Sequence, residues 1–115
     1  MTIETPEERL REFLAGVDAD VVVCGHTHMQ FERAVGGVRI VNPGSVGMPY
    51  GNAGAFWALL GPEIELRSTS YDREAAAARI RQSAWPGAEE FARENVLSVA
   101  SAEEAFAFFR AHGGP

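Results

Sequence analysis

Two histidines separated by one residue are the side chains best suited to chemistry in this sequence. Gly25-His26-Thr27-His28 follows directly on an apolar run at residues 21–24. Neutral imidazole is the commonest metal ligand and suits zinc, iron, copper or nickel, and carboxylates in a mixed site would extend the choice to manganese. In an extended segment, side chains two residues apart point the same way, so both rings are expected to face one site. Two ligands do not complete a catalytic zinc site, which usually has three from the protein.

The segment before the histidines predicts a helix followed by a buried strand. Thr5 is the expected N-cap, with Pro6 at the first helical position. Apolar residues then recur at helical spacing on one face, at Leu10, Phe13, Leu14 and Val17. The apolar run at residues 21–24 is typical of a strand buried on both faces, which would be a rigid mount for the histidines.

Two hairpins are predicted after the histidines. Residues 31–35 and 38–41 flank Gly36-Gly37, a dipeptide that suits a tight turn. Residues 54–60 and 64–70 are joined at 61–63, and the second arm alternates apolar Ile64 and Leu66 with charged residues. That alternation indicates an antiparallel strand with one solvated face. Residues 42–49 between the hairpins are turn-rich and are not expected to form a regular element.

The C-terminal third predicts helices. Asp72 is the expected cap of a helix to about residue 83, broken at 85–87, and a short helix is expected at 88–95. Ser101 and Glu104 form a capping box before a last helix, which the residues at 113–115 would stop. The tail aromatics are interpreted as packing residues, or as surface that a partner would cover: Trp85, Phe91, Phe106, Phe108 and Phe109. The order of elements indicates an α/β or α+β domain.

A wider pattern around the histidines resembles a known family. Asp-Val-Val-Val-Cys-Gly-His-Thr-His at 20–28, the Gly-Gly hairpin and Val-Asn-Pro-Gly-Ser-Val-Gly at 41–47 resemble the C-terminal half of the calcineurin-like metallophosphoesterases. Within them the pattern looks most like the small bacterial phosphodiesterase/phosphatase branch, over roughly residues 5 to 72. The resemblance implies an α/β fold, namely the C-terminal half of a four-layer α/β/β/α sandwich with mixed and antiparallel strands. It divides the chain into that half-domain at 1–71 and a helical C-terminal extension at 72–115 packed on the same domain.

The resemblance also implies a site. Complete family members hydrolyse phosphodiesters or phosphomonoesters at two divalent metal ions, with Mn, Fe, Zn, Ni and Mg not distinguished here. By that resemblance His26 and His28 would each ligate a different ion. Gly25 and Thr27 would lie in the same loop, and the site edge would be formed by Asn42, Pro43, Gly44 and Ser45. No catalytic acid or base is assigned within this chain.

The sequence departs from the family in one respect that decides the expected activity. The Asp-x-His, Gly-Asp and Gly-Asn-His motifs of the N-terminal half are absent, and Gly51-Asn52 is followed by Ala53. We therefore expect a fragment that is inactive alone, with a phosphoester substrate only in the complete enzyme. Its expected partner is the missing N-terminal half or a second copy in a homo-oligomer. The alternative is a metal-free or weakly metal-binding protein-interaction module of the same fold.

Other polar residues have simpler interpretations. Cys24 ends the apolar strand and is read as a small buried hydrophobe, with a thiolate near the metal as the alternative. Ser45 is expected to bond its own loop backbone, and His112 to favour a helix C-terminus. Arg33 and Arg39 flank the Gly-Gly turn and are read as solvating charges, with contact to a substrate phosphate as the alternative.

Composition limits the remaining function classes. The 115 residues suffice for one domain, and the net charge of −6 disfavours general nucleic-acid binding. All ten basic residues are arginine, and without lysine there is no P-loop. No apolar run approaches a membrane span and no secretory signal is visible, so no membrane partner is expected. A single cysteine suits a reducing compartment, and a cytoplasmic location is predicted.

Overall fold

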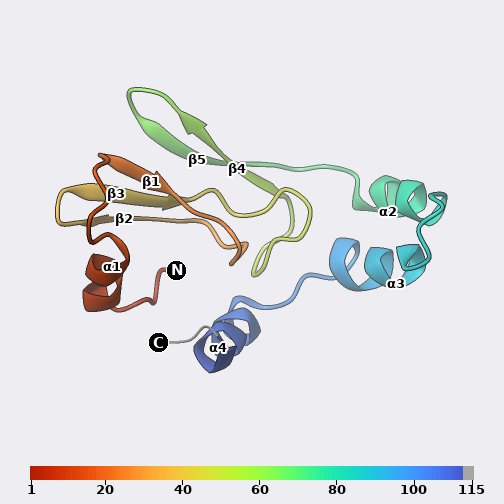
Figure 1. Ribbon diagram of the computed structural model, residues 1–115. Helices are drawn as coiled ribbons and strands as arrows, with labels where there is room; N and C mark the ends of the chain where they lie inside the picture. The colour runs from red at the N-terminus through yellow and green to blue at the C-terminus, as the bar shows by residue number, and fades with distance from the viewer. Residues whose placement is uncertain (113–115) are drawn as a thin grey trace.

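The computed structural model describes residues 1–112 and contains two small sheets and several helices (Figure 1). The helices and strands run in the order α1 (Glu7–Phe13), β1 (Val21–Val23), β2 (Phe31–Val35), β3 (Val38–Asn42), β4 (Ala55–Leu60), β5 (Ile64–Thr69), α2 (Arg73–Arg81), α3 (Ala88–Phe91), the π-helical segment η1 (Ala92–Val96) and α4 (Ala102–His112). The chain is therefore an α/β protein with one mixed and one antiparallel sheet, which confirms the predicted fold class at that level.

The first sheet has the strand order β1-β3-β2. β1 is parallel to β3, with Val22 opposite Ile40, and β2 is antiparallel to β3. Gly36 and Gly37 form the predicted turn with φ values of 58° and 84°, which residues with a side chain adopt only at a cost. The main hydrophobic core lies between this sheet and α1, and its buried members are Leu10, Phe31, Val35 and Ile40.

β1 corrects one prediction. The expected burial on both faces is wrong, because Val21 is 38% and Val23 is 50% exposed. β1 is an edge strand, and within residues 1–112 its second edge pairs with no other strand. The apolar run therefore carries the sequence pattern of an inner strand in a position where nothing described covers it.

α1 corrects a second prediction. Leu10 is fully buried, but Phe13 and Val17 of the expected apolar face are exposed. The helix ends at Phe13, one turn earlier than the pattern suggested, so Val17 lies beyond it. The N-cap is Pro6 without a side-chain bond, and the hydroxyl of Thr5 instead accepts from the Thr2 N–H at 2.8 Å. Thr5 is thus a turn residue of the N-terminal segment.

The second hairpin is formed as predicted. β4 and β5 are antiparallel and pair Ala58 with Leu66. Ile64 and Leu66 are half-buried, while Glu65 and Arg67 between and after them are exposed. The Gln30 amide nitrogen joins this hairpin to the first sheet by donating to the main-chain carbonyls of Trp57 (3.0 Å) and Arg67 (2.9 Å).

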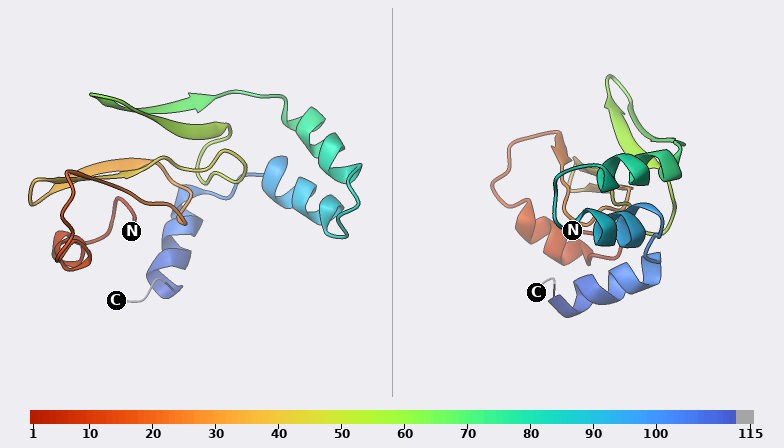
Figure 2. Two further views of the ribbon diagram at one scale, coloured as in Figure 1. Left: turned by 45° about the horizontal axis from the view of Figure 1, so that its top comes forward. Right: turned by 90° about the vertical axis from the view of Figure 1, so that its right-hand side faces the viewer.

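The helices after residue 72 form two groups. Asp72 caps α2 as predicted, with its carboxylate accepting from the Ala75 N–H at 2.9 Å. The expected helix at 88–95 is formed as α3 and the π-helical η1, which pack with α2 around a second core of Ala77, Ala92 and Val96. Figures 1 and 2 show this group at one end of the molecule, apart from both sheets.

α4 lies near the N-terminal segment instead (Figure 1). Its capping box is confirmed, since Ser101 Oγ accepts from the Glu104 N–H at 3.1 Å and donates to the Glu104 carboxylate at 2.9 Å. The predicted stop at residues 113–115 lies outside the described residues. Among the tail aromatics Trp85 and Phe108 are exposed, although each meets a neighbouring ring edge-on, and their interpretation as surface that a partner would cover stays a prediction.

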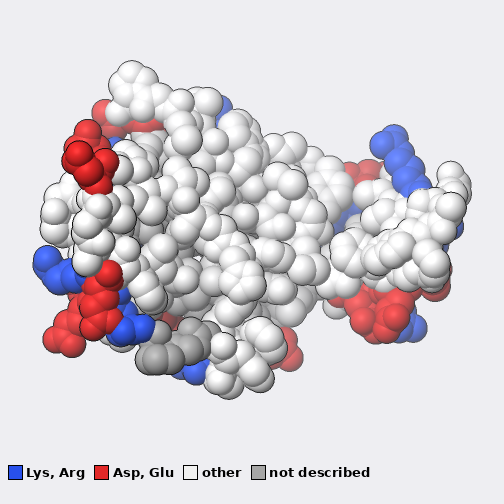
Figure 3. All heavy atoms as spheres, in the orientation of Figure 1, with Lys and Arg blue, Asp and Glu red and all other residues white. Residues whose placement is uncertain are grey.

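The described residues form an extended arrangement. The radius of gyration is 16.2 Å, against about 13 Å expected for a compact domain of about 100 residues. Uncharged side chains occupy most of the face drawn in Figure 3, with charged ones gathered toward its margins. No helix within residues 1–112 combines the length and the apolar character needed to cross a membrane.

Candidate functional site

The histidine loop, Gly25 to His28, follows β1 and bends sharply. His26 has φ 74° and His28 has φ 59°, both in the left-handed region that non-glycine residues seldom adopt. The expectation that an extended backbone aligns the two rings is therefore wrong. Left-handed conformations at two non-glycine residues are locally strained, and such strain persists only where surrounding contacts hold it.

His28 is held by two contacts. Its Nδ1 lies 2.8 Å from the main-chain carbonyl oxygen of Met48, and its ring stacks on Tyr50 with centroids 5.2 Å apart and planes at 19°. A carbonyl only accepts, so Nδ1 carries the proton, and in the neutral ring Nε2 then keeps its lone pair. This is the tautomer and orientation that a metal-ligating histidine requires.

His26 has a different environment. Its ring meets the edge of Phe109 from α4 at a centroid distance of 5.9 Å, and within residues 1–112 it makes no hydrogen bond. Phe109 also lies 6.4 Å from Tyr50, which stacks on His28. One aromatic cluster, made of His26, Phe109, Tyr50 and His28, therefore joins the two histidines despite the bend between them.

Asn42 links the histidine loop to the Asn-Pro-Gly-Ser loop. It lies at the end of β3 with its side chain fully buried. Its amide nitrogen donates to Thr27 Oγ1 at 3.0 Å and to the Gly25 carbonyl at 3.3 Å, and its Oδ1 accepts from the Gly44 N–H at 2.9 Å. The parallel pairing of β1 and β3 brings both loops to the same edge of the sheet, where this amide joins them.

The rest of the Asn-Pro-Gly-Ser loop packs closely against β4. Gly44 has φ 83°, and a Cβ there would lie 2.8 Å from Phe56 Cβ. The Ser45 hydroxyl accepts from the Met48 N–H at 2.9 Å, which confirms its interpretation as a loop residue. That bond also positions the Met48 segment whose carbonyl orients His28. Pro43, between Asn42 and Gly44, is half-buried.

Residues 2–62 match the calcineurin-like phosphoesterase superfamily domain. The chain belongs to this superfamily. The matched region contains the first sheet, both site loops and β4 of the second hairpin, and it excludes β5 and every helix after residue 72. No curated protein matches the chain.

Members of the calcineurin-like superfamily generally depend on divalent metal ions, so the fit of the residues to a metal centre matters. Within residues 1–112, no group of three or more His, Cys, Asp or Glu side chains is placed to hold a metal ion. His28 is in the correct state for a ligand, but two imidazoles fall short of the three protein ligands usual in a catalytic zinc site. The described residues therefore do not fit a complete metal centre, and no reaction step follows from one.

The remaining polar residues named from the sequence have structural partners. Arg39 pairs with Glu32 at 2.5 Å, and Arg33 donates to the main-chain carbonyl of Thr5, so both hold elements of the first sheet and its N-terminal segment. His112 is exposed in the last turn of α4, where Nδ1 lies 3.0 Å from the Phe108 carbonyl.

Cys24 is half-buried against the main core, as expected of a small hydrophobe. Burial raises the pKa of the Cys24 thiol. The neutral thiol is thus favoured in the absence of a metal ion, which agrees with the interpretation of Cys24 as a small hydrophobe.

Sequence reasoning missed the residues that hold the two histidine rings. Met48, Tyr50 and Phe109 contact them from 20 or more positions further along the chain. No spacing pattern relates these residues to the histidine loop. Their contacts arise because the second loop and α4 come to the same end of the first sheet.

Proposed function

We propose that this chain is the histidine-bearing part of a phosphoesterase that hydrolyses phosphodiesters or phosphomonoesters with divalent metal ions. The observation that carries the proposal is the buried Asn42 amide, which joins the histidine loop to the Asn-Pro-Gly-Ser loop within the matched region. His28, with Nδ1 on a carbonyl, is prepared to act as a ligand through Nε2. In this proposal His26 and His28 are ligands and neither is an acid or base.

The proposal includes a complementing segment that supplies the missing ligands. The chain corresponds to the C-terminal half of a four-layer α/β/β/α sandwich of the small bacterial branch, and it acts in the cytoplasm. The exposed face of β1 supports this, because Val21 and Val23 have the character of an inner strand without a neighbour. A strand added there would bury both side chains.

The 115-residue chain alone is expected to be inactive. Bis(p-nitrophenyl) phosphate is incubated with the chain and Mn²⁺, and no turnover above the metal blank is expected because too few ligands are present. Metal-dependent turnover that His28→Ala abolishes would contradict this. Asn52→Ala, an exposed change in the neighbouring loop, is the matched control.

The activity itself is tested on a longer protein that includes the sequence encoded in frame upstream of Met1. We expect Asp-x-His and Gly-Asn-His motifs there and Mn²⁺-dependent hydrolysis. His26→Ala and His28→Ala should each lower the rate at least about 100-fold, since even outer-shell partners of metal ligands contribute about 10- to 100-fold. Hydrolysis that is indifferent to both changes would refute the assignment of the ligands.

A second candidate is a protein-interaction module of the same fold, in the form of a binding partner or of a second copy. It is favoured by the absence of a third metal-binding side chain in the described part of the chain. Calorimetric titration with Mn²⁺ separates the candidates. Binding that both histidine substitutions abolish supports the phosphoesterase, whereas no binding even by the longer protein supports the module. Sedimentation that detects only monomer excludes the second copy.

A further inference from the structure

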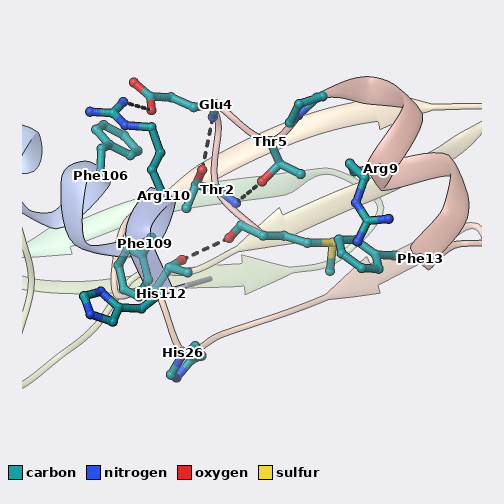
Figure 4. A pocket seen from close by; sticks show the side chains of 13 residues that line it. Thr2, Glu4, Thr5, Arg9, Phe13, His26, Phe106, Phe109, Arg110 and His112 are labelled. Carbon is teal, nitrogen blue, oxygen red and sulfur yellow. Dashed lines mark hydrogen bonds and ion pairs between the residues drawn. The ribbon is translucent and has the colours of Figure 1, made fainter. Parts of the chain in front are cut away.

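A pocket of about 630 Å³ lies beside the histidine loop, between the N-terminal segment, α1 and α4 (Figure 4). This volume falls within the range of small-molecule sites, about 300–1,000 Å³. His26 and Thr27 contribute to its wall from the histidine loop. The pocket is therefore continuous with the candidate site, although most of its lining comes from other elements.

Aromatic side chains stand at both ends of this pocket. Phe106 and Phe109 project from α4 at one end, and Phe13 lies at the other, at the end of α1 (Figure 4). Phe109 is also the ring that meets His26 at 5.9 Å. Aromatic rings separated by a space favour a planar apolar group between or against them, because ring pairs are stabilised by edge and offset contacts.

Arginines outnumber carboxylates among the residues that line this pocket. The lining has two arginines, Arg9 and Arg110, against one carboxylate, Glu4. In the whole chain, acidic residues outnumber basic ones by 16 to 10. Arg110 Nη1 bonds to Glu4 at 2.6 Å, and a guanidinium carries five N–H donors, so this contact does not exhaust its capacity. Arg9 also pairs with Glu12 outside the lining, so the two arginines are balanced by two carboxylates, and what the pocket offers an anion is the further N–H donors of these guanidinium groups.

We propose that this pocket holds the aryl or similarly planar organic group of a phosphoester, with the phosphoryl end directed toward His26. The inference rests on the proposed function and adds the class of substrate. α4 lies outside residues 2–62, so the aromatic wall is a feature of this chain beyond the matched domain. The substrate is identified by two chemistries together, an anionic phosphoryl group and a flat apolar group.

The test compares ligands on the 115-residue chain without metal. Phenylphosphonate, methylphosphonate and benzyl alcohol are titrated by calorimetry, with amide chemical shifts locating the site. We expect phenylphosphonate to bind about tenfold or more tightly than methylphosphonate, because its ring buries apolar surface. We also expect it to bind more tightly than benzyl alcohol, and to shift the amides of Thr5, Thr27 and Phe109.

Variants on one helix provide a matched control. Phe106→Leu and Phe109→Leu remove rings that line the pocket, and each should lower the phenyl-to-methyl preference at least about threefold. Phe108→Leu changes a ring on the same helix that is 57% exposed and outside the lining; because this ring meets Phe109 edge-on at 5.6 Å, the change should lower the preference less than either lining variant does. Leucine retains apolar volume and helix propensity, so α4 should remain formed.

Three results would overturn the inference. Equal affinity for phenylphosphonate and methylphosphonate would show that no aryl group is recognised. Equal affinity for phenylphosphonate and benzyl alcohol would show that the phosphoryl group adds nothing. Amide shifts remote from the pocket would place the ligand elsewhere. The binding test involves neither a metal ion nor turnover, so a negative result in it does not refute the proposed hydrolysis. Conversely, absence of hydrolysis by the longer protein would not change the ratio of phenylphosphonate to methylphosphonate affinity.

Discussion

Replacing Asn42 with alanine tests whether one buried amide holds the two site loops together. Asn42 makes three hydrogen bonds, to Thr27, Gly25 and Gly44, and its side chain has no exposed surface. Alanine removes the donor and the acceptor together. The buried Thr27 hydroxyl and the half-buried Gly44 N–H then lose their partner, and water does not readily replace a partner at a buried group.

The magnitude follows from the bonds lost. A typical intramolecular hydrogen bond contributes about 0.5–1.5 kcal/mol net, so three give about 1.5–4.5 kcal/mol for Asn42→Ala. This is a large fraction of the roughly 5–15 kcal/mol that stabilises an ordinary domain. Asn42→Asp is expected to cost a similar amount, because it keeps the acceptor for Gly44 but faces the Gly25 carbonyl with a second acceptor.

Urea unfolding of the 115-residue chain measures the effect. The midpoint should fall while the m-value stays unchanged, since the surface exposed on unfolding is the same. Asn52→Ala is the matched control, because Asn52 is exposed and its loss should lie within about 0.5 kcal/mol of zero. A change of less than about 0.5 kcal/mol for Asn42→Ala would refute the role assigned to the amide.

Two further changes test local geometry. Gly44→Ala should destabilise the chain by more than about 1 kcal/mol in the same urea assay, because φ is 83° and the new Cβ would meet Phe56. Gly47→Ala is the control and should be nearly neutral, because a Cβ there has open space around it. Equal effects of the two changes would contradict the strain assigned to residue 44. The backbone N–H and hydroxyl of Ser101 hold the pKa of the Glu104 carboxyl below its usual value. Its capping is therefore present above the unfolded pKa and is lost as pH falls through the folded pKa. The backbone carbon chemical shifts of α4, followed down to acid pH, should show this loss of capping as a titration step. The Glu104→Gln protein should show no such step. A step at the same pH in both proteins would exclude titration of the Glu104 cap as its cause.

The elements that the sequence predicted well are those determined by local chemistry. The Gly36-Gly37 turn sets the register of β2 and β3, and Asp72 and Ser101 satisfy the first N–H groups of their helices. These signals act over a few residues, so they can be read without knowing the tertiary structure. The same holds for the alternation of β5, where apolar and charged side chains divide between two faces.

The predictions that failed concern what lies next to an element. The run at residues 21–24 indicates a strand suited to burial, but Val21 and Val23 are exposed because no described element packs beside β1. The left-handed conformations of His26 and His28 were also not predicted, since a positive φ is uncommon at any residue other than glycine, even though histidine adopts it more often than most. Contacts with Tyr50 and Phe109, distant in sequence, accompany those conformations.

Within residues 1–112, the free edge of β1 and the incomplete set of metal-binding side chains occur at the same place. β1 runs directly into the histidine loop, so its carboxyl end lies at the site. A further strand parallel to β1 would also end there, because the carboxyl ends of parallel strands meet at one edge of a sheet. One added strand could therefore bury Val21 and Val23 and, from the loop that follows it, bring carboxylates to the two imidazoles. The proposal of a complementing segment thus gives the apolar exposure and the missing ligands one explanation, which is why the longer protein is the decisive material for measuring hydrolysis.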